Sequence, residues 1–255
     1  MSEKIKKSII RTILPLAFWL GVWQILAVQV NFPLLLPSPA SVGRTLLELA
    51  GTGTFWKSIF LSLGRVLAGL LLGCFLGCLS AFLTFQFPIV DLLLSPAIRV
   101  IRATPVVSFI LLVYLWVVRA NIPGCISTLM VLPIMWNRMR LGLDSVDQKL
   151  LEMASAYRFG RIKTIRLIWL PSLRSYFSSG LADALGLAWK SGVAAEVICP
   201  PRYAIGTELS KAKTALQSPE LYAWTVVIIL LSLTMEVVLR RLLNLRKAKD
   251  ACQKS

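Results

Sequence analysis

Three charged residues lie within one apolar stretch of this sequence, and they are its first candidates for chemistry: Asp183, Lys190 and Glu196. At 100° per residue, Asp183 and Lys190 share one helix face, while Glu196 lies about 240° further round. Charged side chains in a membrane span are costly and usually face a bundle interior or water. These residues, with the neighbouring Trp189, therefore either pair inside a helix bundle or line a pathway through it. Arg65, in an earlier apolar stretch, is a candidate partner for one of them.

Residues for most catalytic chemistry are missing. The sequence has no His, which removes the commonest metal ligand and the usual general base near neutral pH. Its five cysteines include no Cys-x-x-Cys pair, and three lie in apolar runs, so we interpret them as packing residues. No Gly-x-x-x-x-Gly-Lys-Ser/Thr phosphate loop occurs, and the nearest string, residues 186–191, lacks the second Gly. These observations argue against catalysis by this chain and predict no bound metal.

The composition is that of a membrane protein. Of the 255 residues, 56% are hydrophobic and 16% are charged, and the mean hydropathy is +0.73. Too little polar surface remains to cover a soluble globule of this size. The 28 Lys and Arg outnumber the 12 Asp and Glu. Such an excess suits nucleic acid, anionic lipid or cytoplasmic loops, and the positions of the charges decide among them.

Six apolar segments approach the length of about 20 residues that a spanning helix needs. They cover residues 13–30, 59–85, 105–118, 122–136, 177–198 and 221–243. We expect an all-α, polytopic membrane bundle with about six transmembrane helices. The third and fourth segments are short and are separated by residues 119–121 alone, which predicts either a tight helical hairpin or spans that extend at their cytoplasmic ends. The first segment lacks a small-residue cleavage site and is expected to remain as an anchor.

The basic residues favour one orientation of this bundle. With the N-terminus inside, most of the Lys and Arg fall in residues 1–12, in the loops before the third and fifth segments, and in a tail of residues 244–255. The positive-inside rule then places both termini in the cytoplasm of a bacterial cell, with the chain crossing the plasma (inner) membrane. The single permease domain would be residues 13–243, with a cytoplasmic loop at 138–174. Lipid contact and these loops explain the net charge of +16 without nucleic acid.

Three glycines repeat along the second segment. Gly69, Gly73 and Gly77 form a doubled small-xxx-small pattern on one helix face, which lets another backbone approach closely. The partner lies either in the same subunit or across a dimer seam. A bundle of six helices has more internal than external contacts, which favours the partner within the subunit.

The polar loop at 138–174 contains a predicted amphipathic helix. Asp144 is a candidate N-cap with Asp147 at the third helical position, and Gly160 can end the helix. Its apolar face would contain Val146, Leu150, Met153 and Tyr157, a pattern that Leu151 interrupts. A basic helix of this kind either lies on the membrane surface or docks on a partner.

Particular residues in this loop favour docking. The string EMASAYRFGRIKTIRLIWLP, residues 152–171, resembles the cytoplasmic "EAA" motif of integral-membrane subunits of ATP-binding-cassette (ABC) importers. The segments LPSP at 36–39, RATP at 102–105, GLAWK at 186–190 and AAE at 194–196 resemble the nitrate, sulfonate and taurine branch of these permeases. Two positions depart from the motif: Met153 replaces Ala, and Arg158 stands where a Gly is usual.

The resemblance implies a type I ABC importer permease fold and a non-catalytic transport subunit. The loop helix would be a coupling helix inserted into a groove of a cytoplasmic ABC ATPase dimer, which would hold ATP and Mg. Glu152 could pair with a basic residue, Ala154 and Ala156 would permit close approach, and Met153 and Tyr157 would fill an apolar cleft. Gly160 and Arg161 complete the implied coupling set.

The other implied partners are an external solute-binding protein and a second copy of the chain. The solute would be a small anion, a sulfonate or a compound resembling a vitamin precursor. An ion-coupled secondary transporter is the alternative, which should show inverted repeats and midplane carboxylates. The sequence shows no repeat, and only the charges of the fifth segment qualify. A membrane enzyme would need a catalytic cluster, which we do not find.

Overall fold

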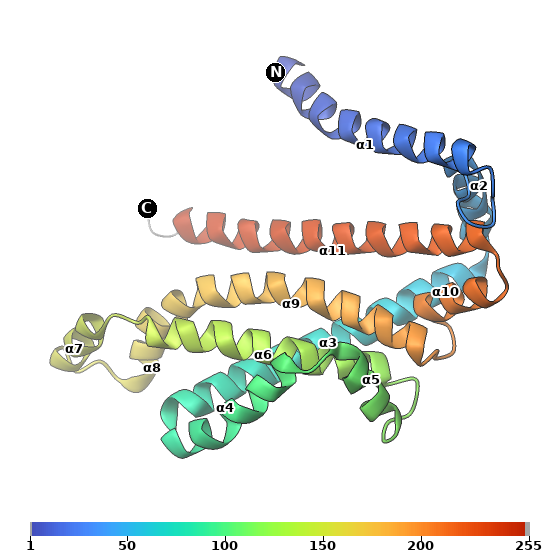
Figure 1. Cartoon of the computed structure of the whole chain (residues 1–255). Coiled ribbons are helices and arrows are strands. Elements are labelled where there is room, and N and C mark those ends of the chain that lie inside the picture. The colour runs from blue at the N-terminus through green and yellow to red at the C-terminus, as the bar shows by residue number, and fades with distance from the viewer. Residues whose placement is uncertain (1, 253–255) are drawn as a thin grey trace.

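The computed structural model describes residues 2–252, and it describes side chains from residue 14 to residue 243 apart from Leu16 and Arg161. The described chain consists of helices and their connections, with no strand in this part of the chain (Figure 1). Its elements are α1 (Ser2–Val30), α2 (Pro39–Ala50), α3 (Gly53–Gln86), α4 (Pro88–Ala103), α5 (Val106–Tyr114), α6 (Ile122–Asp144), α7 (Gln148–Ala156), α8 (Arg161–Thr164), the π-helical turn η1 (Ile165–Trp169), α9 (Leu170–Ile198), α10 (Ile205–Thr214) and α11 (Ser218–Cys252).

The centre of the bundle is formed by α3, α6 and α9, which pack against one another. Gly69, Gly73 and Gly77 all face α6 in the same chain. A Cβ at Gly69 would overlap the Gly124 carbonyl, while one at Gly73 or Gly77 would lie 2.7 or 2.6 Å from the Cβ of an α6 residue. The glycines therefore let the two helix backbones approach more closely than any side chain would allow. Of the two partners considered for this face, the structure shows the one within the chain.

Hydroxyl groups join these central helices. The Thr128 hydroxyl of α6 donates to the Gly69 carbonyl of α3 over 3.1 Å, and the Ser127 hydroxyl donates to the Ala188 carbonyl of α9 over 3.1 Å. The indole of Trp136 donates to the Thr84 hydroxyl over 3.0 Å. Polar side chains of this kind hold helices together where lipid removes the hydrophobic drive for their association.

The predicted spans correspond to α1, α3, the pair α4 and α5, α6, α9 and α11. Within the described residues, α3 and the part 218–243 of α11 are long and apolar enough to cross a membrane. The pair α4 and α5 is a third such element if it is counted as one span. Polar and charged residues interrupt the apolar runs of α6 and α9. These two helices lie at the centre of the bundle, where polar side chains can bond to neighbouring helices instead of facing lipid.

The prediction of a span at residues 105–118 is wrong in its bounds. The chain breaks at Thr104 and Pro105, α4 and α5 are bent by 105° across this break, and α5 contains nine residues. Proline disfavours the helical conformation of the residue before it, and Thr104 accordingly has ψ 133°. The fourth predicted span extends at its far end, since α6 continues to Asp144.

The two ends of the molecule differ in their elements. Figure 1 shows α7, α8 and the end of α11 at one end, with α2 and α10 at the opposite end. Helix α1 leans away from the bundle and contacts it near its own end, where Trp23 donates to the Pro37 carbonyl and stacks on Tyr222. Earlier in α1, large apolar side chains such as Phe18 and Trp19 are exposed.

The contact between α3 and α6 predicts a large difference between two identical substitutions on one helix. Gly69→Ala should lower the thermal unfolding midpoint of the detergent-solubilised protein, at a cost of about 1–3 kcal/mol, because its methyl group overlaps the α6 backbone. Gly64→Ala is the matched control, since a Cβ at Gly64 meets nothing within 4 Å. Equal midpoints for the two variants would contradict this account of the packing.

Candidate functional site

Helix α7 begins at Gln148, and its N-cap is Asp147 rather than Asp144. The Asp147 carboxylate accepts the Lys149 N–H over 2.9 Å and is the N-cap. Asp144, predicted as the N-cap, is instead the last residue of α6 and pairs with Arg140 over 3.3 Å. The prediction was wrong because α6 extends further than its apolar run, so α7 starts later and is only nine residues long.

The far end of α7 is closed by a tight turn centred on Arg158. The Arg158 N–H donates to the Ser155 carbonyl over 2.9 Å, and the Phe159 N–H donates to the Ala154 carbonyl over 2.8 Å. This pair of bonds is a Schellman motif, which requires a left-handed residue at Arg158, and the φ of Arg158 is indeed 52°. Gly160, predicted to end the helix, lies beyond this turn without a positive φ. Arg158, which replaces the usual Gly of the motif, therefore adopts the left-handed backbone conformation that Gly would normally supply.

Apart from Val146, the residues that pack α7 on the chain lie outside the predicted apolar face. Ala154, Val146 and Ile168 form a small buried cluster, with Leu151 among the residues packed around it. Leu151, which interrupts the predicted face, is thus an inward residue. Ala154 is 2% exposed, so in this chain its close packing is against the chain itself. Contact with Ile168, at the start of the next span, selects this face of the helix.

The other apolar side of α7 faces outward. Leu150, Met153 and Tyr157 are 40%, 46% and 72% exposed, so this chain leaves three spaced apolar side chains only partly covered. Glu152, Ala156 and Gly160 are also exposed, and the side chain of Arg161 lies outside the described residues. We call Leu150, Met153 and Tyr157 the α7 stripe.

A short path of packed side chains links α7 to the centre of the bundle. The turn η1 joins α8 to α9, and its Ile168 belongs to the cluster under α7. The adjacent Trp169 packs edge-on against Phe85 of α3, with ring centroids 5.6 Å apart. A displacement of α7 would therefore act on α9 and α3 through packed side chains rather than through a loose linker.

At the opposite end, a buried carboxylate fastens the connection between α9 and α10 to α3. Glu196 is 0% exposed, and its Oε2 accepts the Ser62 hydroxyl over 2.8 Å and the Gly206 N–H over 3.2 Å. The Ile205 N–H donates to the same Ser62 hydroxyl over 2.9 Å. Arg65 lies one turn further along α3, with Nη1 3.7 Å from Glu196 Oε1. The expected partner of Arg65 is therefore Glu196.

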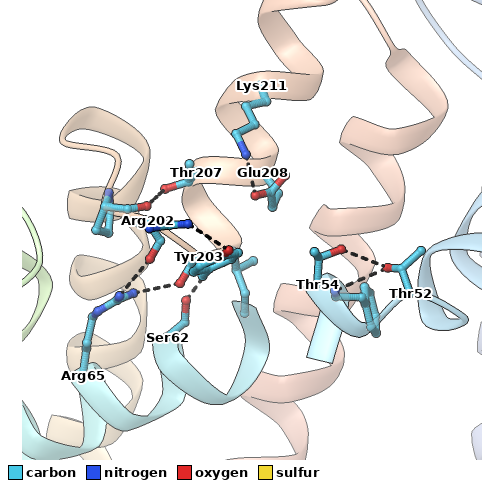
Figure 2. Close-up of polar contacts among 12 residues, drawn as sticks. Thr52, Thr54, Ser62, Arg65, Arg202, Tyr203, Thr207, Glu208 and Lys211 are labelled. Carbon is cyan, nitrogen blue, oxygen red and sulfur yellow. Dashed lines mark hydrogen bonds and ion pairs between the residues drawn. The ribbon is translucent and has the colours of Figure 1, made fainter. Parts of the chain in front are cut away.

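Arg65 also fastens the connecting backbone directly. Figure 2 shows its guanidinium donating to the carbonyls of Arg202 and Tyr203, over 3.0 and 3.1 Å. The Arg202 side chain donates to the Tyr203 hydroxyl and, with Lys57, lowers the pKa of this phenol. We call Ser62, Arg65 and Glu196 the α3–α9 latch. Because the Glu196 side chain lies wholly inside it, internal pairing accounts for this residue better than lining a pathway.

The remaining charges of α9 lie apart from the latch. Asp183 accepts a hydrogen bond from Arg138 of α6 over 2.6 Å, and both side chains are about half exposed. Trp189 is buried, and its indole donates to the Ile228 carbonyl of α11 over 3.2 Å. Lys190 is exposed and makes no hydrogen bond or ion pair with any residue whose side chain is described. The structure thus separates Glu196 from Asp183 and Lys190.

The latch also contains residues that sequence reasoning missed. Ser62 and the backbone of 202–206 belong to it, yet Ser62 is 134 residues from Glu196. The one signal available was the spacing of Ser62 and Arg65, since a hydroxyl and a cation one turn apart in an apolar helix share a face.

Solved structures share this arrangement of helices. An amino acid ABC transporter chain described as being with histidines aligns with a TM-score of 0.64 at 16% identity, over 80% of this chain and 97% of that chain. A chain of a bacterial transporter that imports the acidic polysaccharide alginate aligns with a TM-score of 0.59 at 16% identity, over 95% and 99%. The fold is thus that of an ABC importer permease. The family described as binding-protein-dependent transport system inner membrane component matches residues 69–246, and this chain belongs to that family.

Curated relatives confirm the branch that the sequence motifs indicated. The taurine transport system permease TauC of Escherichia coli K12 is 25% identical, over 95% of this chain and 89% of the relative. The putative aliphatic sulfonates permease SsuC of the same strain is 28% identical over 78% and 77%. The nitrate import permease NrtB of Leptolyngbya laminosa is 28% identical over 70% and 67%. Membership of this family removes the secondary-transporter alternative.

The turn at Arg158 predicts opposite effects for two substitutions. Arg158→Gly should relieve left-handed strain of about 1 kcal/mol, whereas Arg158→Val should increase it because a β-branched side chain fits this region poorly. Hydrogen exchange of the amides at 155–159 should slow in the first variant and accelerate in the second. If the amides at 155–159 exchanged at the same rate in both variants, the turn would not depend on this backbone conformation.

The latch predicts a local effect of removing one cation. Arg65→Met should free the carbonyls of Arg202 and Tyr203 and leave Glu196 without its counter-charge, so the amides at 199–206 should exchange at least about tenfold faster. Arg44→Met, at an exposed site on α2, removes the same charge without loss of such contacts. Exchange at α7 serves as an internal reference and should stay constant. Equal exchange at 199–206 in the two variants would refute the latch.

Proposed function

We propose that this chain is the membrane-spanning subunit of an importer that moves a small anionic solute and is driven by a separate cytoplasmic ATPase docked on α7. The observation that carries the proposal is the α7 stripe, formed by Leu150, Met153 and Tyr157. These side chains project from a short helix whose opposite side is fixed to the start of α9.

The chemistry of the stripe suits a helix-in-groove contact. Apolar residues three and seven positions along a helix share one face and fill successive pockets of an apolar groove. Exposed Glu152 lies about 100° round the helix from Met153, where it can pair with a basic residue at the rim of the groove. An apolar surface of this kind at the end of a membrane protein costs free energy unless a partner covers it.

The structure offers a mechanical route from this contact to the spans. Closure of a pair of ATPase subunits around ATP would move the two coupling helices of a homodimer relative to each other. Each α7 would transmit the movement through Ile168 to α9, and through Trp169 and Phe85 to α3. The central packing of α3, α6 and α9 would then tilt as a unit between inward-open and outward-open states.

The orientation and the solute class rest on charge and on the relatives. The loop that contains α7 is rich in Lys and Arg, which favours placing it, with the end of α11, in the cytoplasm. The end with α2 and α10 would then meet a solute-binding protein outside. The relatives are named for taurine, aliphatic sulfonates and nitrate, so we propose an oxyanion or a sulfonate as the solute.

Substitution of the stripe should uncouple the ATPase without unfolding the permease. The double variant Met153→Ala and Tyr157→Ala should weaken association with the co-expressed ATPase about tenfold to a hundredfold, because exposed anchors of this kind dominate binding. The measurements are co-purification and ATP hydrolysis by the reconstituted complex. Leu47→Ala, at an exposed apolar residue of α2, is the control and should bind normally. Wild-type association of the double variant would refute docking at α7.

A further inference from the structure

A cleft between α9 and α11 remains after the latch and the α7 stripe are accounted for. Its volume is about 380 Å³, and its polar lining comes from both helices: Asp183, Lys190, Ser232, Glu236 and Arg240. Gly186 lies in the same wall. Both helices belong to the expected membrane spans, so a polar cavity of this size in this position requires an explanation.

The formal charges of the cleft lining cancel, with two carboxylates and two cations, but one of the cations is left without a partner. Asp183 pairs with Arg138 over 2.6 Å, and Glu236 pairs with Arg240 over 2.7 Å. Lys190 has no partner among the residues whose side chains are described, and the Ser232 hydroxyl makes no hydrogen bond within that part of the chain. An uncompensated ammonium group in a span is expensive unless it faces water or a counter-ion. The cleft therefore presents one free positive charge and one free hydroxyl donor.

Gly186 places no side chain in the part of the cleft next to Lys190. It lies four residues before Lys190, on the same face of α9, and a Cβ there would meet nothing within 4 Å. Gly180 and Gly192 of the same helix differ, because their Cβ positions would contact Arg138 and Val66. A glycine inside a helix costs about 1 kcal/mol relative to alanine, and close packing does not explain this one. Its lack of a side chain leaves the cleft open at this point.

We propose that Lys190 and Ser232 bind the anionic group of the transported solute within this cleft. The proposal rests on the importer function proposed above and adds a solute site inside the membrane-spanning part of the chain. The Lys190 ammonium supplies charge and up to three donors, and the Ser232 hydroxyl supplies another, which together suit the oxygens of a sulfonate, nitrate or bicarbonate group. An anionic phospholipid headgroup has the same oxyanion chemistry, and the test separates the two sources.

The test measures binding to the whole permease–ATPase complex in phosphatidylcholine nanodiscs, without a solute-binding protein. Sodium salts of methanesulfonate, nitrate and bicarbonate, and taurine, are titrated while the thermal midpoint is recorded, because a ligand of the folded state raises it. At least one should give a saturable increase. Lys190→Met should raise the half-saturating concentration about tenfold or more, and Lys190→Arg should largely restore it.

Two further variants make the result specific to the cleft. Gly186→Leu keeps the charge but fills the space, so it should also abolish the saturable increase. Lys213→Met, at an exposed site on α10, removes the same charge elsewhere and should bind as the wild type does. Phosphatidylglycerol nanodiscs provide the lipid arm, in which the solute-induced increase should persist.

The outcomes distinguish this site from the importer function. A complex that transports with its binding protein, yet binds none of the probes or binds them equally after Lys190→Met, overturns the site alone. An increase produced by phosphatidylglycerol and not by the solutes also overturns it, in favour of a lipid. A complex in which the ATPase neither docks nor drives transport overturns the proposed function, and the solute site with it.

Discussion

Close contact between α3 and α6 is the constraint on which the rest of this structure depends. In lipid, apolar side chains gain little by leaving their surroundings, so helices associate through backbone proximity and polar bonds. Gly69, Gly73 and Gly77 supply the proximity, and Thr128 supplies a bond across it. Helix α9 joins the same pair through the Ser127 bond to Ala188 and through Gly192, which lies against Val66. The relative positions of α3, α6 and α9 are therefore set by their own contacts, without the peripheral helices.

The two functional ends are attached to this centre in different ways. At the α7 end the attachment is apolar, through Ile168 and the ring contact of Trp169 with Phe85. At the other end it is polar, through the carboxylate of Glu196 and the guanidinium of Arg65. Apolar contacts tolerate small sliding movements, whereas a buried network of directional hydrogen bonds permits few geometries. The end that is proposed to receive mechanical work is therefore the more adaptable one.

The sequence predicted those features that a local pattern determines. The glycine repeat, the loop helix with its motif and the all-α bundle follow from spacing along one segment, and the structure contains each of them. The pairing of Arg65 inside the chain was expected too, although its partner was open. The family motifs identified the branch because they occur at several separate positions.

The features that could not be predicted from the sequence depend on contacts between residues far apart in the chain. Helix α7 has two apolar faces, one with Leu151 and Ala154 and one with Leu150 and Met153, and only the position of Ile168 selects between them. The N-cap at Asp147 depended on how far α6 extends, which its apolar run does not show. The bond from Ser62 to Glu196 joins residues 134 positions apart, and no periodicity within either helix encodes it.

The bend between α4 and α5 limits how the chain can be placed in an assembled transporter. The backbone is non-helical at two residues, Thr104 and Pro105, and Pro105 is exposed in the single chain. Peptide groups without helical partners are not tolerated against hydrocarbon, although they are tolerated against protein or water. At hydrocarbon depth, such a bend would require the side of the bundle that contains it to be screened from acyl chains, which would leave only the remaining perimeter to the bilayer.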